Sequence, residues 1–241
     1  MKVLFIGDIH GHDTWKELVN KALTNFYEIV FLGDYVDSFS IKPVDIAFNL
    51  IEIINFKIKH PDKVTLLLGN HDYAYINDYM CTGFDATIAD SYKKIFQDNH
   101  KLFDIAWGYL GINGKYTLAT HAGLTKGYYD YSIKPILDYP GNKLNKIIEG
   151  INNIEIHQIL NILKDDHKVL WKIGRRRGGS SHPSPLWADY QELLVDRYKG
   201  INQVFGHTTT GTLTVSVEYT DLIVKVDDSM AQHTMHILLD L

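Results

Sequence analysis

The sequence predicts an α/β domain in which short buried strands alternate with amphipathic helices. Two observations along the chain of 241 residues support this fold class. First, five apolar runs each end in glycine or threonine followed by a polar residue, as buried strands do. Second, the segments between the first three runs carry apolar residues at helical spacing. Strands and helices in alternation are typical of a sheet with helices on its faces.

The five apolar runs are the predicted strands, and each is followed by a residue that can bind a metal ion. The runs span residues 3–6, 29–32, 64–68, 116–119 and 201–205. In open α/β sheets the functional crevice lies at the carboxyl ends of the strands. We therefore expect one crevice to collect the side chains that follow the runs: Asp8, His10, Asp34, Asp37, Asn70, His71, His121 and His207.

Two helices are predicted between the first three strands. One covers 13–26, with Asp13 as its N-cap, and the other covers 43–59 and begins at Pro43. The second helix is expected to carry its apolar residues on one face: Ile46, Ala47, Leu50, Ile51, Ile54 and Ile58.

The stretch from about 124 to 186 departs from this alternation, and we interpret it as a cap inserted in a single domain of residues 1–241. A helix is expected near 142–164 within the cap. The tail, 213–240, alternates in short apolar runs, which indicates antiparallel strands that close the sheet.

Composition limits the classes of partner. The net charge of −5 argues against a general nucleic-acid binder, so no stable nucleic-acid partner is expected. One cysteine, Cys81, cannot form an internal disulfide and fits a reducing, cytoplasmic setting. No apolar run is long enough to span a bilayer, so no membrane partner is expected either. The oligomeric state is left open.

The side chains after the strands form a ligand set of carboxylate, imidazole and amide oxygen. Such a set suits Mn²⁺, Fe or Zn²⁺ in sites with five or six ligands. No thiolate accompanies these residues, which argues against a structural zinc site. Each residue taken singly is better explained by a helix cap or a solvated loop, so the prediction depends on the order of all these residues and on their occurring together.

Five motifs resemble, in order, the signatures of the calcineurin-like metallophosphoesterases. The similarity spans positions 7–208 and is strongest, from Phe31 to Asn77, to the serine/threonine phosphoprotein phosphatases and their bacterial and phage relatives. The motifs are Gly7-Asp8-Ile9-His10-Gly11, Gly33-Asp34-Tyr35-Val36-Asp37, Gly69-Asn70-His71-Asp72, His121-Ala122-Gly123 and Gly206-His207-Thr208.

The resemblance implies a fold and a pair of metal ions. The fold would be a β-sandwich of central mixed sheets flanked by helices, with an inserted helical cap. Asp8, His10 and Asp34 would hold one ion, and Asp34, Asn70, His121 and His207 the other. Two divalent ions, with Mn²⁺ as first choice and Fe or Zn²⁺ as alternatives, would share a water molecule, lower its pKa and aim it at phosphorus.

The resemblance also implies a proton donor. His71 follows a ligand without being one, and its imidazole has a suitable pKa to protonate the leaving group. Asp37 would orient that ring. The alternative is a purely structural role for His71. Asp227 or Asp228 is a candidate for holding a ligand histidine, although a pair of acids in a β-turn explains them equally well.

Two arginines that the phosphoprotein phosphatases carry near the phosphate are absent, and Ser38 and Leu68 stand in their places. Neither side chain can grip two phosphoryl oxygens as an arginine fork does. Arg177, and after it Arg175, are the candidate substitutes, in a segment that resembles bacterial members of the family. The alternative is a solvated basic turn.

The function implied is hydrolysis of phosphomonoesters, on phosphoprotein side chains or a small molecule. The sequence Asn70-His71-Asp72 also resembles phosphodiesterases, but these often carry a histidine where this chain has Thr209. One alternative is a hydrolase of dinucleoside polyphosphates, so the substrate is either a phosphorylated protein or a nucleotide. An alternative of another class is a weakly active, phosphate-binding module.

Overall fold

The computed structural model describes residues 1–24, 27–139, 155–179, 182–209, 214–218, 221–226 and 236–241. Its strands are β1 (Lys2–Ile6), β2 (Glu28–Phe31), β3 (Val64–Leu67), β4 (Phe103–Asp104), β5 (Ala106–Leu110), β6 (Tyr116–Thr120), β7 (Asn202–Phe205), β8 (Thr214–Glu218), β9 (Asp221–Lys225) and β10 (His236–Asp240). Its α-helices are α1 (Trp15–Thr24), α2 (Pro43–Lys59), α3 (Asn70–Ile76), α4 (Ala89–Asp98), α5 (Lys126–Tyr128), α6 (Lys134–Asp138), α8 (Ile156–Ile162), α9 (His167–Leu170) and α10 (Tyr190–Asp196). Shorter helical turns are η1 (His100–Leu102), η2 (Tyr129–Ile133), η3 (Leu163–Asp165) and η4 (Arg175–Arg177).

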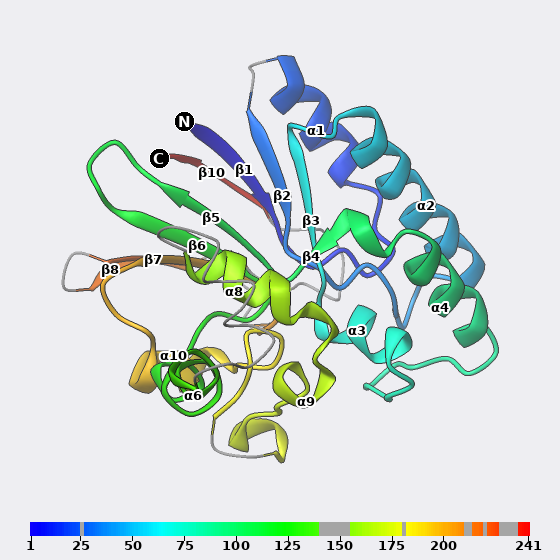
Figure 1. The fold of residues 1–241 in the computed structure, drawn as a ribbon. Helices are drawn as coiled ribbons and strands as arrows, with labels where there is room; N and C mark the ends of the chain where they lie inside the picture. Colours follow the sequence, from blue (N-terminus) through cyan, green and yellow to red (C-terminus); the bar gives the residue numbers. More distant parts are fainter. Residues whose placement is uncertain (25–26, 140–154, 180–181, 210–213, 219–220, 227–235) are drawn as a thin grey trace.

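The strands form two mixed sheets of five strands each (Figure 1). The first has the order β10-β1-β2-β3-β4, in which β1 to β4 are parallel and β10 is antiparallel. The second has the order β5-β6-β7-β9-β8, with a parallel centre and an antiparallel strand at each edge. The expected fold of mixed sheets flanked by helices is therefore confirmed.

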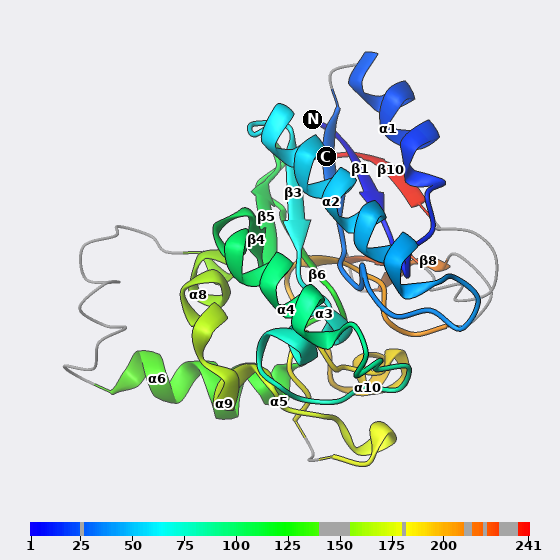
Figure 2. The same cartoon turned by 90° about the vertical axis from the view of Figure 1, so that its right-hand side faces the viewer.

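Alternating side chains of the first sheet face two different layers, because successive residues of a strand point to opposite sides. Val3 and Phe5 of β1 pack toward the second sheet, in one cluster with Trp107 and Val204. Leu4 and Ile6 belong to the larger cluster that also contains buried residues of the helices. In Figures 1 and 2, α1, α2 and α4 cover the outer face of the first sheet.

The predicted strands agree with β1, β2, β3, β6 and β7 to within one residue at every end. The second predicted helix is α2 with the same bounds, but its apolar residues do not share one face. Ile46, Leu50 and Ile54 are buried, whereas Ile51 and Ile58 are 39% and 57% exposed. Since a helix turns by 100° per residue, Ile51 and Ile58 lie opposite Ile46, and the prediction of a single apolar face is wrong for them.

Other expectations are met in part. Helices α5, α6, α8 and α9 lie between residues 124 and 186, and of the helix expected near 142–164 the described part is Ile156–Ile162. In the tail, β8 and β9 form an antiparallel pair in the second sheet, while β10 joins β1 in the first. The tail therefore contributes strands to both sheets.

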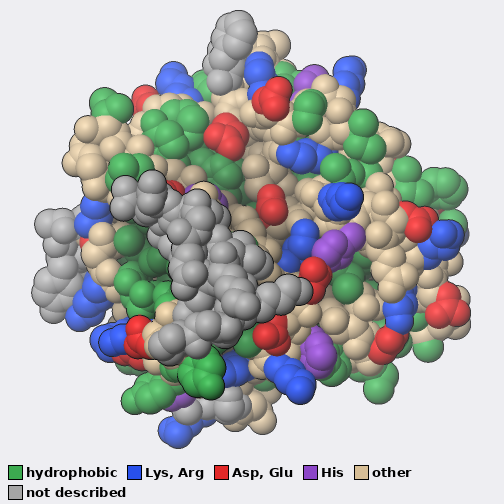
Figure 3. All heavy atoms as spheres, viewed as in Figure 1, with side chains coloured by type: hydrophobic (Ala, Val, Ile, Leu, Met, Phe, Trp, Pro, Cys, Tyr) green, Lys and Arg blue, Asp and Glu red, His purple; other side chains and the backbone are tan. Residues whose placement is uncertain are grey.

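The character of the helices and the charges on the surface both concern the kinds of partner that the protein can bind. Among the described residues, no helix combines the length and apolar character that crossing a membrane requires. On the face shown in Figure 3, lysine and arginine side chains are interspersed with aspartate and glutamate. That face therefore presents mixed charge rather than one sign of charge.

Candidate metal centre

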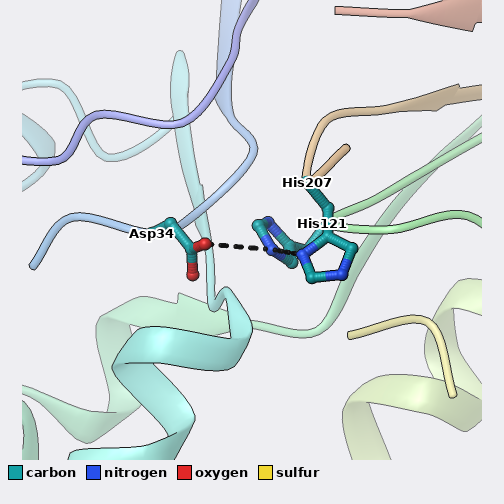
Figure 4. A group of neighbouring side chains, drawn as sticks. All are labelled: Asp34, His121 and His207. Carbon is teal, nitrogen blue, oxygen red and sulfur yellow. Dashed lines mark hydrogen bonds and ion pairs between the residues drawn. The ribbon is translucent and has the colours of Figure 1, made fainter. Parts of the chain in front are cut away.

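Side chains that follow strands of both sheets meet at one edge of the sandwich. Within the described residues, two groups of side chains could each hold a metal ion. In each group, the potential ligand atoms all lie within 4.8 Å of one another. The first group is Asp8, His10 and Asp34, and the second is Asp34, His121 and His207. Asp34 belongs to both groups. Figure 4 shows the second group, with the Asp34 carboxylate pointing at the two imidazole rings.

Backbone carbonyl groups orient the imidazole ring of His10. Its Nδ1 lies 2.9 Å from the carbonyl oxygens of both Val36 and Asp37. A carbonyl oxygen can only accept, so Nδ1 carries the proton and Nε2 has the lone pair. That Nε2 lies 3.9 Å from Oδ2 of Asp34. The loop after β2 thus selects the tautomer in which His10 can act as a ligand through Nε2.

The ring of His121 is oriented in the same way. Its Nδ1 donates to the carbonyl oxygen of Leu32 at 2.9 Å, which leaves Nε2 facing the centre. This Nε2 lies 3.0 Å from Oδ1 of Asn70, 3.0 Å from Nδ1 of His207 and 3.3 Å from Oδ2 of Asp34. Four potential ligand atoms therefore converge from α3 and from the loops that follow β2, β6 and β7.

The electrostatics of the cluster favour positive charge. Burial by itself would raise the pKa of Asp34, but His121, His71 and His10 together hold it below its ordinary value. Burial lowers the pKa of His121, yet the carboxylates of Asp34 and Asp8 raise it to about 9. In addition, the buried Nε2 of His207 has no hydrogen-bond partner in the described part of the chain. Buried donor atoms of this kind fit divalent cations.

The backbone at the centre adopts an unusual conformation. Five non-glycine residues in the described segments have positive φ, and four of them belong to the site: His10, Asp34, Asp37 and His207, with φ of 43°, 51°, 63° and 69°. Such conformations cost about 1–3 kcal/mol each and persist where the surrounding structure enforces them. Left-handed residues at these four positions turn side chains of neighbouring strands toward one point.

Two glycines permit a close approach between the ends of β2 and β3. Gly33 has φ of +105°, and a Cβ atom there would lie 2.4 Å from the backbone nitrogen of Gly69. A Cβ atom on Gly69 would lie 2.0 Å from Oδ1 of Asp34. A side chain at Gly69 would therefore displace the Asp34 carboxylate, and a side chain at Gly33 would push the two loops apart.

Asp72 stabilises this pair of loops, a role that we did not predict from the sequence. Its carboxylate accepts hydrogen bonds from the backbone N–H groups of Asp34, Tyr35 and Gly69, at 2.8, 2.9 and 2.9 Å. The side chain is fully buried, and burial, followed by the charge of Asp34, raises its pKa to about 7. Asp72 thus holds the ligand loops without facing the cluster directly.

His71 and Asp37 form a hydrogen-bonded pair beside the metal centre. Nδ1 of His71 lies 2.7 Å from Oδ2 of Asp37, and the His71 backbone N–H donates to Oδ1 of Asp34 at 2.9 Å. The other Asp37 oxygen accepts from the hydroxyl of Tyr75 at 2.6 Å. Tyr75 was not predicted, although its spacing of four residues from His71 in α3 places both on one face of the helix.

A cavity of about 380 Å³ opens at the centre. Asp34, Asn70, His71 and His207 line it together with Cys81, Thr82, Arg177, Trp187, Asp189, Thr208 and Thr209. The guanidinium of Arg177 donates to the carbonyl oxygen of His207 at 3.4 Å and lies 3.8 Å from Oδ2 of Asp189. This candidate therefore lies at the edge of the metal centre.

The other arginine candidate lies elsewhere. Arg175 lines a separate cavity of about 650 Å³, together with Arg176, Lys126 and Glu192. Of the positions where the phosphoprotein phosphatases carry arginine, Leu68 is buried and Ser38 is half-buried. Asp227 and Asp228 lie outside the described residues.

Comparison with known proteins agrees with this geometry. A family model described as calcineurin-like phosphoesterase matches residues 1–210. Over 132 residues the chain is 30% identical to the serine/threonine-protein phosphatase PP1-delta of Caenorhabditis elegans, which is 51% of this chain and 39% of that protein. The matched segment is thus about two fifths of the length of that relative.

Two solved structures of cold-active protein-tyrosine phosphatases share the fold. The first, from a psychrophilic Shewanella species, has a TM-score of 0.59 and 17% identity over 99% of this chain and 75% of that one. The second has a TM-score of 0.56 and 17% identity over 99% and 73%. At such identities the likeness concerns the fold alone.

Proposed function

This chain belongs to the calcineurin-like phosphoesterase family, and from that premise we propose that it is a metal-dependent phosphatase acting on phosphomonoesters. One observation carries the proposal. The Asp34 carboxylate is common to two groups of metal ligands, and it also accepts the backbone N–H of His71, whose ring lines the same cavity. Metal ligands and a proton donor are therefore within reach of one bound phosphate.

We assign Asp8, His10 and Asp34 to one ion, and Asp34, Asn70, His121 and His207 to the other. Two divalent ions bound there would lower the pKa of a water molecule and offset negative charge on the phosphoryl oxygens. The ligand set accepts several metals, and Mn²⁺ is our first choice, with Fe or Zn²⁺ as alternatives. The absence of thiolate among the ligands supports this choice over a closed zinc site.

His71 is assigned as the general acid and Asp37 as the residue that orients it. The carboxylate of Asp37 binds Nδ1 of His71 at 2.7 Å, so the proton that is transferred sits on Nε2. That arrangement directs Nε2, rather than Nδ1, at the leaving group. The His71 side chain is 12% exposed, which leaves it accessible from the cavity.

A comparison of His71→Asn with His100→Asn tests this assignment. His100 also pairs with an aspartate, since its Nε2 lies 3.0 Å from Asp165, but that pair lies on the surface. With Mn²⁺ and an aryl phosphate we expect His71→Asn to lower kcat more than about a hundredfold, and His100→Asn to leave it unchanged. Unchanged activity in His71→Asn, with metal content equal to the wild type, would exclude the general-acid role.

Arg177 is assigned to the substrate phosphate in place of the two missing arginines, and Arg175 is kept as the second candidate. The two residues form a matched pair, because one lines the metal cavity and the other a neighbouring cavity. We expect Arg177→Ala to raise KM about tenfold or more and Arg175→Ala to change it less than about twofold. The reverse result would transfer the assignment to Arg175.

The substrate is distinguished by assaying a phosphoserine peptide beside a dinucleoside tetraphosphate. We expect faster cleavage of the phosphopeptide, because this chain has Thr209 where phosphodiesterases often have a further histidine, so the first metal ion would lack that ligand. Faster cleavage of the dinucleoside compound would establish the alternative. A chain that binds no metal under any loading condition would favour the phosphate-binding module.

We further propose that residues 1–241 form one domain with a cap at about 124–186, and that the protein works in the cytoplasm. The helices α5, α6, α8 and α9 support the cap, and the single cysteine supports the location. Limited proteolysis tests the domain proposal: a stable fragment that ends near residue 124 would contradict it.

A further inference from the structure

The outer face of α2 is apolar, although it faces solvent. Val44, Phe48, Ile51 and Ile58 are 49%, 64%, 39% and 57% exposed. Their spacing of four, three and seven residues places them in one stripe along the helix, and the exposed Asn55 completes it. We call these five residues the outer stripe. In Figure 2, α2 faces the viewer between α1 and α4.

The outer stripe is not needed to hold α2 in the fold. The opposite face already packs on the domain through Ile46, Leu50, Ile53 and Ile54, all of which are buried. A surface helix anchored in this way normally has polar residues on its outward face. Four large apolar side chains in one exposed stripe instead mark a surface that binds another protein.

The positions of the stripe residues match those of a second copy running in the opposite direction. Val44 and Ile58 each lie seven residues from Ile51, which is about 10 Å along the axis. A two-fold axis beside Ile51 therefore sets Val44 of one copy against Ile58 of the other, and the reverse. Asn55 lies within the stripe, where a single polar residue selects the register and the number of helices.

The charges beside the stripe complement each other in the same arrangement. Asp45, Glu52 and Lys59 are seven residues apart, and each follows a stripe residue by one position. In the antiparallel pair, Asp45 of each copy lies beside Lys59 of the other. Glu52 lies near the axis, but it is neutralised within its own chain by Lys16, at 2.8 Å. In a parallel pair the same heptad position of the two copies lies on opposite sides of the contact, so Asp45 would not lie beside Lys59.

We propose that this protein forms a homodimer in which the α2 helices of two copies pack antiparallel through the outer stripe. The contact is isologous, since each copy contributes the same residues, and it closes at two subunits. It is independent of the metal centre, because none of the stripe residues lines the catalytic cavity. Dimerisation therefore adds a property that the phosphatase reaction does not require.

Sedimentation velocity on the full chain, from about 1 to about 100 µM, tests the interface. The wild type should sediment as a dimer. Phe48→Glu should weaken dimerisation at least about a hundredfold, because it buries an unpaired charge in the contact. Ile112→Glu is the matched control, since Ile112 is fully exposed in the turn between β5 and β6. This variant should remain dimeric. Equal circular dichroism spectra would show that all three chains are folded.

A charge reversal tests the orientation. Asp45→Lys should weaken the dimer about tenfold by placing lysine beside Lys59, and adding Lys59→Asp should restore it. A wild type that stays monomeric throughout the range would overturn the proposal. A dimer that Phe48→Glu leaves intact would also overturn it. A double variant that dimerises no more tightly than Asp45→Lys would overturn the antiparallel pairing.

Discussion

Tyr75 should control proton transfer by His71 without touching the substrate. Its hydroxyl donates to Oδ1 of Asp37 at 2.6 Å, and the same hydroxyl accepts the backbone N–H of Asp85 at 2.9 Å. The other oxygen of Asp37 binds His71. Tyr75→Phe removes one hydroxyl group and keeps the ring, which stacks on Phe84 with centroids 4.6 Å apart. Asp37 then loses the contact that prevents its carboxylate from rotating.

The expected magnitude follows from one hydrogen bond to a charged group. Such bonds contribute about 1.5–3 kcal/mol, and about 1.4 kcal/mol in the barrier is a factor of ten in rate. If misorientation of His71 raises the barrier to proton transfer by the lower of these values, kcat falls about tenfold. The loss is restricted to reactions that need the proton, because the Tyr75 hydroxyl bonds to Asp37 and Asp85, and neither is a candidate metal ligand.

The assay compares two substrates that differ in leaving group. The phenolate released from phenyl phosphate is a poor leaving group and needs protonation, whereas dinitrophenyl phosphate releases dinitrophenolate, which leaves readily as an anion. We expect Tyr75→Phe to lower kcat about tenfold on the first and less than about twofold on the second. Tyr92→Phe is the matched control, since it deletes another buried tyrosine hydroxyl, one that donates to the carbonyl oxygen of Pro43. Equal losses on both substrates would refute the reasoning, because they would indicate a general structural defect.

Three further predictions concern metal binding, the close approach of two loops and the thiol. Asp34→Asn removes the carboxylate that both metal groups share. Elemental analysis after dialysis should therefore show that the variant retains less of both metal ions. Loss of one ion alone would contradict a shared ligand. Gly33→Ala combines positive φ with a Cβ atom 2.4 Å from the Gly69 nitrogen. The free energy of unfolding in urea should therefore fall by about 3 kcal/mol or more. An unchanged midpoint of unfolding would show that the two loops can separate at little cost in free energy. Burial and the charge of Asp34 raise the pKa of the Cys81 thiol above its ordinary value. Alkylation by iodoacetamide at about pH 8 should therefore be slow in the folded chain and fast in urea. Equal rates in the two conditions would contradict the burial of the thiol.

The sequence was sufficient for the strands β1, β2, β3, β6 and β7 and for the set of candidate ligands, because both depend on local patterns. Strands such as β1 and β3 are short apolar runs, and their ends coincide with glycine and a polar residue. Asp8, Asp34 and His207 lie within three residues of the ends of β1, β2 and β7. Their convergence is a consequence of strand ends meeting at one edge, so the order of the motifs along the chain already predicted it.

The contacts around the ligands could not be predicted in this way, because they join residues far apart in the chain. Asp72 receives hydrogen bonds from a loop 37 and 38 residues earlier, and Tyr75 binds Asp37 over a similar separation. Neither contact leaves a periodic signal in the sequence. The choice between Arg177 and Arg175 is of the same kind, since two residues in one turn line different cavities.

By itself the sequence determined the α/β class, the ends of β1, β2, β3, β6 and β7 and the types of candidate ligand, all of which depend on neighbours within a few residues. The tertiary structure decided which side of α2 is buried, which sheet receives β10 and how the His71–Asp37 pair is held. These features depend on burial and on hydrogen bonds across the sandwich. Such interactions come into being only when distant segments pack together, which is why the pattern of residues along the chain did not contain them.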